Sequence, residues 1–153
     1  MTIVVAALAA LAAPVLAGSG SIVAGSYRYS PFDETPTRAV SIRAQADAGG
    51  VAGSWEWINL LDGTRHSGSI TCLVVNGSDA WLAGPDFAAG DPAGAFFRLH
   101  DGGAPGAEHD EAVAFIGDPG QTLHELEAWC QQRNVGIDLF PLDEGNLVVR
   151  VGP

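Results

Sequence analysis

Residues 38–46 read RAVSIRAQA, and their side chains alternate between apolar and polar. A period of two is typical of a β-strand with one buried face, because successive side chains of a strand point to opposite sides of the sheet. The segment therefore predicts a half-buried strand. The apolar set on its buried face consists of Val40, Ile42, Ala44 and Ala46.

Two further strand candidates follow at residues 54–61 and 67–76. Asp62-Gly63-Thr64 lies between them and is compatible with a hairpin turn, so the three segments predict an antiparallel meander. In the second candidate both alternating sets are largely apolar, which predicts a strand covered on both faces. We expect this strand to be central. The two sets are Ile70, Cys72 and Val74 on one face and Thr71, Leu73 and Val75 on the other.

Short apolar or alternating segments elsewhere complete the sheet, and Asn76-Gly77-Ser78-Asp79 is a second turn signal between two of them. Together they predict an all-β fold of about eight antiparallel strands, either a sandwich or a small closed barrel. The additional strand candidates are 22–29, 80–83, 95–100, 112–116 and 146–151.

One segment near the C-terminus departs from this period. Apolar residues recur there at steps of three and four, which predicts a single amphipathic α-helix with Cys130 on its buried face. Asp118 is the expected N-cap, with Pro119 at the first helical position and Gly136 beyond the end. The apolar positions are Leu123, Leu126, Trp129 and Cys130.

The chain of 153 residues carries a formal net charge of −11, and 47% of its residues are hydrophobic. This acidity argues against nucleic acid as a partner, because phosphate binding needs a basic face. The hydrophobic content is enough to bury a core and argues against intrinsic disorder. The length fits one domain, which we expect to span residues 18–153.

Residues 1–17 predict a secretory signal peptide, since residues 3–16 are almost entirely apolar and Val15 and Ala17 are small residues at the expected cleavage site. The expected location is therefore secreted, either extracellular or at the cell surface of a bacterium, with no stable membrane span after cleavage. A retained N-terminal anchor and a start codon placed too late are the alternatives, because the leading segment lacks a basic side chain. The apolar run is shorter than the roughly 20 residues of a spanning helix.

Cys72 and Cys130 are the two cysteines of the chain. Two cysteines in an oxidising compartment usually pair, and these lack the C-x-x-C spacing of a redox or zinc site. We expect a disulfide that joins the helix to the sheet. Two separately buried thiols are the alternative.

Three marks occur in a fixed order between residues 67 and 151. They are the segment SGSITCLVVNGSDA at 67–80, the loop DGGAPG at 101–106 and the ending GNLVV at 145–149. Together they resemble the post choice-of-anchor-protein (post-COAP) domain of small secreted bacterial proteins. The resemblance implies an exported antiparallel β-domain without an assigned activity, and it supplies no catalytic residue.

No catalytic motif is apparent in the sequence. The histidines at 66, 100, 109 and 124 lie on different predicted elements and are interpreted as solvated loop or strand-edge residues, and neither an H-E-x-x-H helix nor a G-x-S-x-G elbow is present. We therefore expect a protein that is not an enzyme. The alternatives are a carbohydrate- or small-ligand-binding domain and, third, a barrel hydrolase or isomerase.

Two aromatic pairs are the candidate ligand-binding residues. Tyr27 and Tyr29 share one strand face, and Trp55 and Trp57 share another. Exposed coplanar rings would suggest stacking on a glycan of a cell surface, whereas aromatic side chains in general fill cores. The core interpretation is favoured, and sugar binding is kept as its alternative.

An acidic loop supplies the only cofactor hypothesis, which is calcium. Its carboxylates lie around a glycine- and proline-rich turn and could offer several of the six to eight oxygen ligands that calcium prefers. A solvated loop that keeps the protein soluble is the competing interpretation, and under it no cofactor is expected. The four candidate ligands are Asp101, Glu108, Asp110 and Glu111.

Overall fold

A computed structural model describes residues 20–31, 35–103, 106–116 and 120–152. The expected signal peptide and the two residues expected to start the helix, Asp118 and Pro119, lie outside this part of the chain. The described residues form nine β-strands and one α-helix. The elements are β1 Ser21–Tyr29, β2 Arg38–Asp47, β3 Gly50–Asn59, β4 Arg65–Ser69, β5 Cys72–Asn76, β6 Asp79–Pro85, β7 Gly94–His100, β8 Glu111–Ile116, α1 Leu123–Gln131 and β9 Phe140–Arg150.

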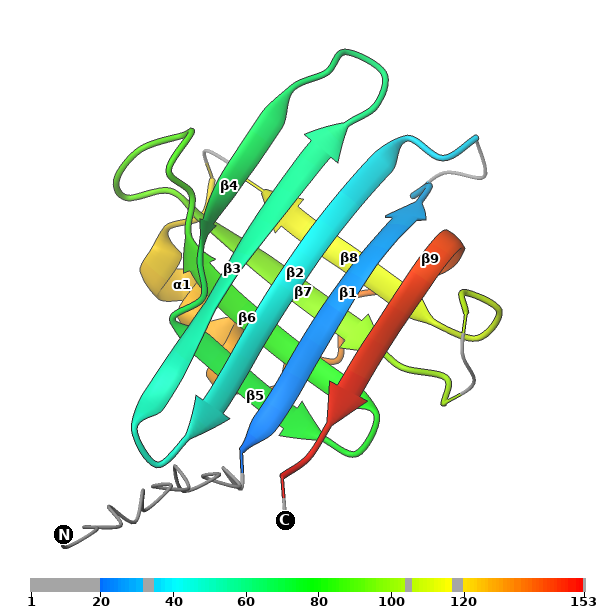
Figure 1. Ribbon diagram of the computed structural model, residues 1–153. Helices are drawn as coiled ribbons and strands as arrows, with labels where there is room; N and C mark the ends of the chain where they lie inside the picture. Colours follow the sequence, from blue (N-terminus) through cyan, green and yellow to red (C-terminus); the bar gives the residue numbers. More distant parts are fainter. Residues whose placement is uncertain (1–19, 32–34, 104–105, 117–119, 153) are drawn as a thin grey trace, which may run out of the picture.

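The fold is a single antiparallel sheet of nine strands with the order β4-β3-β2-β1-β9-β8-β7-β6-β5. The sheet curls so that β4, β3, β2, β1 and β9 form one layer while β8, β7, β6 and β5 run across behind it (Figure 1). Helix α1 covers the far side of the second layer (Figure 1). The predicted all-β fold with one helix is confirmed.

Segment 67–76 differs from its prediction. It is divided into β4 and β5, which stand at the two ends of the strand order, so the expected central strand is wrong. The reason is a change of hydrogen-bond partner between adjacent residues: the amide of Ile70 donates to Gly53 of β3, whereas that of Thr71 donates to Ala83 of β6. The chain therefore turns a corner from one layer to the other.

Two glycines allow the backbones to meet at this corner. A Cβ atom on Gly84 would lie 1.7 Å from the carbonyl oxygen of Ser69, and one on Gly68 would lie 1.8 Å from that of Pro85. No side chain fits at these distances. The β4–β5 corner thus depends on Gly68 in β4 and on Gly84 in β6.

Two apolar clusters hold the layers. The larger one fills the space between the two sheet layers and includes Val23, Ile42, Leu82 and Phe97. The smaller one lies between the second layer and α1. The corner explains why Ile70 belongs to the first cluster and Cys72 to the second, although the sequence pattern placed them on one face.

The helix begins one turn later than expected. Its N-cap is Thr122, whose hydroxyl accepts from the Glu125 amide while the Glu125 carboxylate accepts from the Thr122 amide. This reciprocal capping box fixes the start at Leu123, so Asp118 is not the N-cap. Cys130 lies on the buried face and forms the expected disulfide with Cys72.

Candidate ligand-binding site

A pocket of about 400 Å³ opens between the two layers at one end of the curled sheet. Three aromatic side chains and one guanidinium group line it, together with residues 113–116 of β8. The three rings come from β1, β3 and β9, whereas the ring of Phe115 packs on Trp129 at the helix side of β8. The lining residues are Tyr29, Pro31, Arg38, Trp57, Val113, Ala114, Phe115, Ile116 and Phe140.

The pocket exists because two strands separate. The ladder between β8 and β9 comprises two residue pairs, Glu111 with Pro141 and Ala112 with Phe140. Beyond Ala112, residues 113–116 continue to pair with β7 but have no ladder partner on the β9 side among the described residues. On the opposite side, the register between β1 and β9 shifts at Arg28/Tyr29. This edge of β8, where the Ala114 backbone contacts the Tyr29 phenol instead of a ladder partner, therefore borders the pocket.

Trp57 is held between a cation and an imidazole. The Arg38 guanidinium carbon lies 5.5 Å from the centre of the indole, within the range of a cation–π contact. The ring of His66 meets the indole edge-on at 5.7 Å. His66 Nδ1 in turn lies 2.7 Å from a carboxylate oxygen of Asp86, which is buried. These contacts fix the orientation of the half-buried Trp57 side chain.

The histidines are expected at solvated loop positions or at strand edges, and His66 lies on the edge strand β4. Its side chain is 21% exposed, and its Asp86 partner also accepts from the amides of Ala88 and Ala89. A buried carboxylate that has both a cation-forming partner and backbone donors is well compensated. This arrangement orders the loop after β6 next to the pocket.

Below the pocket, the core contains polar atoms without a hydrogen-bond partner among the described residues. They include the Tyr27 hydroxyl and the indole nitrogens of Trp55 and Trp57. The Trp57 indole lies near the Tyr29 phenol but not in hydrogen-bond geometry with it. Buried polar atoms are usually satisfied, so these unpaired groups are a local cost to the stability of the core.

The pKa values of the two phenols are raised. Burial is the main cause for both, and the neighbouring Tyr29 adds to the shift at Tyr27. At Tyr29, the Trp57 side chain, the Ala114 backbone and the Arg38 charge partly offset the effect of burial. Both phenols therefore stay protonated at neutral pH and can donate hydrogen bonds.

The raised tyrosine pKa values make the fold sensitive to alkali. The unfolded chain releases these protons above about pH 10, whereas the native state retains them, so the stability is complete below pH 10 and falls as the pH rises further. We expect Tyr27→Phe to weaken this alkaline loss while leaving the stability at pH 7 equal or higher, because the hydroxyl has no partner. Urea unfolding at pH 7 and pH 11 measures both effects. An unchanged alkaline loss in the variant would contradict this account.

The predicted ligand-binding aromatics all lie on inner faces of the curled sheet. Tyr27, Tyr29 and Trp55 are buried in the core, and Trp57 is half-buried at the pocket. Of the four, Tyr29 and Trp57 line the pocket. None of them forms part of an exposed platform, which is the arrangement that the sugar-stacking interpretation required.

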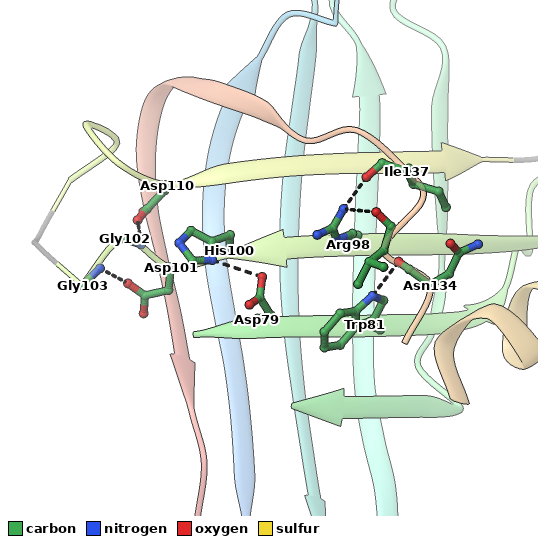
Figure 2. A network of polar contacts seen from close by, with 11 residues as sticks. Asp79, Trp81, Arg98, His100, Asp101, Gly102, Gly103, Asp110, Asn134 and Ile137 are labelled. Atoms are coloured by element: carbon green, nitrogen blue, oxygen red, sulfur yellow. Dashed lines mark hydrogen bonds and ion pairs between the residues drawn. The ribbon is translucent and has the colours of Figure 1, made fainter. Parts of the chain in front are cut away.

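The four candidate calcium ligands do not form one site, and Figure 2 shows that Asp101 and Asp110 are each engaged with backbone amides. Asp110 is 1% exposed, and its carboxylate accepts from the amides of Gly102 and Leu147. Asp101 likewise accepts from Gly103 and Val149. Within the described residues, no group of three or more His, Cys, Asp or Glu side chains is placed to hold a metal ion. The solvated interpretation of Asp110 is wrong, while calcium binding remains a prediction.

These two carboxylates replace ladder partners that β9 lacks. The backbone amides of Leu147 and Val149 in β9 donate to side chains of the loop between β7 and β8, and not to a neighbouring strand. The remaining two candidates differ from them: Glu108 is exposed, and Glu111 is the first residue of β8. Asp101 and Asp110 thus have a structural function that the sequence spacing did not indicate.

Replacing Asp110 by asparagine should destabilise the protein by about 1–3 kcal/mol, because one of the two amides loses its acceptor inside the protein. Glu108→Gln serves as the matched control, since that side chain is exposed and should be near neutral. Urea denaturation in chelator measures both variants. An Asp110→Asn protein as stable as wild type would show that the carboxylate does not secure β9.

A second hollow, of about 300 Å³, lies on the outer face of β1, β2 and β3. Its charged groups have partners of their own: Arg28 lies 3.5 Å from Glu144, and Glu56 lies 3.8 Å from Arg65. These pairs are solvent-exposed and leave no charge available for a ligand. The hollow between the layers is therefore the better binding site.

Sequence reasoning missed Arg38, Phe115 and Phe140 as pocket residues. Arg38 stands two residues before Val40, so the period of two already placed it on the inner face of β2, a signal that was not used. What the segment could not show is which residues Arg38 meets there, since Phe115 and Phe140 come near it only after the sheet curls.

No family model, curated protein or solved structure matches the chain. The resemblance to the post-COAP domain accordingly stays a prediction. Among the described residues, no helix has the length and apolar character needed to cross a membrane.

Proposed function

We propose that this protein is an exported, non-enzymatic β-domain that binds a small and mostly apolar molecule in the pocket between its sheet layers. The observation that carries the proposal is the pocket itself, with the aromatic side chains of Tyr29, Trp57 and Phe140 and few polar groups. Sites for small ligands are typically concave and apolar, with a small number of polar groups that orient the ligand.

The proposed architecture is a barrel that closes at the β4–β5 corner. Three backbone hydrogen bonds support closure: Ile70 to Gly53, Thr71 to Ala83, and Phe87 to Ser67. They connect the bent segment to β3 on one side and to β6, with the residues after it, on the other. A closed sheet with an open end provides an interior site for one small ligand.

Export is supported by the disulfide and by the apolar segment at residues 1–17. Disulfides persist in oxidising compartments and are rare in the cytosol. The resemblance to post-COAP domains points the same way. We therefore place the ligand outside the cytoplasm, and the proposed setting is extracellular or at the cell surface.

Binding is favoured over catalysis by the chemistry of the polar groups in the pocket. The Arg38 guanidinium is permanently charged and cannot act as a base. The Tyr29 phenol has a raised pKa and stays protonated, so it is a hydrogen-bond donor and not a nucleophile. Both groups suit the orientation of a ligand.

The test is titration of the protein with N-phenyl-1-naphthylamine, a neutral probe whose fluorescence rises in apolar surroundings. We expect saturable binding to wild type. Ala114→Phe, which places a ring in the pocket, should lower the affinity at least about tenfold, a difference of 1.4 kcal/mol. Ala39→Phe is the matched control because Ala39 lines the outer hollow.

Thermal melting first establishes that both variants are folded. The absence of saturable binding to wild type would overturn the proposed function. Equal affinity for wild type and Ala114→Phe would also overturn it, since the probe would then occupy another site. Loss of binding in Ala39→Phe alone would assign the site to the outer face.

A further inference from the structure

Arg38 is a cation in the pocket, and its hydrogen-bond acceptors are neutral groups. Its Nη1 donates to the Thr37 carbonyl oxygen at 3.0 Å and to the Asn59 side-chain oxygen at 3.1 Å. Among the described residues, no carboxylate lies within ion-pair distance of it. A guanidinium group has five N–H donors, so this geometry leaves donors for a further acceptor.

Although the chain has a net charge of −11, the lining of the pocket contains, among the described residues, no acidic residue to neutralise Arg38. Arg28 and Arg65, on the outer face, are each paired with a glutamate. The Arg38 charge does act on an acidic group, Asp62. The pKa of Asp62 is lowered chiefly by the Thr64 backbone and in small part by Arg38. Asp62 is fully exposed in the β3–β4 turn, where solvent screens its charge.

The orientation of Arg38 is fixed before a ligand arrives. Trp57 supports the guanidinium plane, and His66 and Asp86 hold Trp57 from the other side. A preorganised guanidinium binds a carboxylate with two parallel hydrogen bonds, and partial burial strengthens them relative to water. The Tyr29 phenol lies within electrostatic range of Arg38 and stays protonated, so it adds a hydrogen-bond donor without adding negative charge.

We propose that the pocket selects molecules that carry one carboxylate on an aromatic or otherwise apolar body, with Arg38 as the anion-binding residue. The inference rests on the proposed function and adds the class of its ligand. One guanidinium group matches one monoanionic carboxylate. A phosphate dianion would need further cationic donors, and the lining contains only the one permanent cation among the described residues.

The experiment compares two probes of the same shape, 2-naphthoate and 2-naphthamide, as competitors that displace N-phenyl-1-naphthylamine. We expect the carboxylate to bind wild type roughly tenfold more tightly than the neutral amide, in line with a charge-assisted hydrogen-bonded pair. Arg38→Gln should reduce 2-naphthoate binding to the level of the amide. Binding of the amide should change little, which shows that the variant pocket is intact.

Two further variants make the test specific. Asp62→Asn removes a charge that solvent already screens, so it should change the binding of 2-naphthoate and of 2-naphthamide little. Arg65→Gln is the matched control, because Arg65 pairs with Glu56 away from the pocket, and it should affect neither probe.

The outcomes separate the inference from the proposed function. If both probes bind wild type equally, or if Arg38→Gln weakens them equally, Arg38 does not recognise the carboxylate, and the inference fails while the pocket stands. If the neutral dye itself does not bind, the proposed function fails and the inference falls with it. A carboxylate preference that survives in Arg38→Gln would place the anion at another group.

Discussion

Replacing Gly84 by alanine is expected to remove more than about 4 kcal/mol of stability, a loss that only a few structural mechanisms cause. The added Cβ would lie 1.7 Å from the carbonyl oxygen of Ser69 and 2.8 Å from its carbonyl carbon. Both are backbone atoms of the β4–β5 corner and cannot rotate away. The corner must then open, and the hydrogen bond from Thr71 to Ala83 is lost with it. Urea denaturation followed by tryptophan fluorescence measures the effect.

The matched control is Gly136→Ala. An added Cβ there would come no closer than 3.4 Å, to the flexible side chain of Asn134. The free energy of unfolding of this variant should lie within about 0.5 kcal/mol of the wild-type value. A Gly84→Ala protein with the same stability as its control would mean that the two layers do not meet at this corner.

Loss of the disulfide is the second large effect. Cys72 and Cys130 are 58 positions apart, and the cross-link restricts the unfolded chain by about 4 kcal/mol according to the chain-entropy relation. The bond also holds α1 against β5. The double variant Cys72→Ala/Cys130→Ala should therefore unfold at a much lower urea concentration than the oxidised wild type.

Reduction provides the control for this prediction. Dithiothreitol should lower the midpoint of wild type towards that of the double variant and should leave the double variant unchanged. If the free energy of unfolding of the double variant were less than about 1 kcal/mol below that of the oxidised protein, the loss would lie outside the usual range for a native disulfide. It would show that apolar packing alone docks the helix.

Local periodicity was sufficient to predict much of the fold. The alternation at β2 and the three- and four-residue spacing at α1 report which face of each element is buried, and burial is the dominant stabilising term. The pairing of Cys72 with Cys130 was predicted on other grounds, from the presence of two cysteines in a chain expected to be exported. These features depend on neighbours within a few positions along the chain.

The errors of the sequence interpretation came from long-range contacts. Segment 67–76 looks like one strand because each residue fits a pleated backbone, yet the partners of Ile70 and Thr71 lie on different layers. Asp110 looks like a loop carboxylate because its acceptor role depends on Leu147. Neither partner can be recognised from the local sequence.

The candidate site was predicted only in part. Tyr29 and Trp57 were singled out as aromatic residues, but their joint position follows from the curl that brings β1 and β3 opposite β8. Arg38 has the same parity as Val40 and Ile42 and so was placed on the inner face by the alternation, but its partners in the pocket could not be identified from that segment. The site is a property of the curled sheet more than of any segment.

The central claim is that the pocket beside Trp57 binds a small apolar molecule. The most direct test is a titration with 2-naphthamide followed through the indole N–H signals of the four tryptophans in a ¹H–¹⁵N spectrum. Trp57→Phe assigns the Trp57 signal. Trp81 is the internal control, because its indole nitrogen donates to the Asn134 carbonyl oxygen on the helix side of the sheet.

We expect the Trp57 signal to shift in a saturable manner while the Trp81 signal stays in place. Binding without a shift at Trp57, or no saturable change in any indole signal up to millimolar probe, would contradict the account.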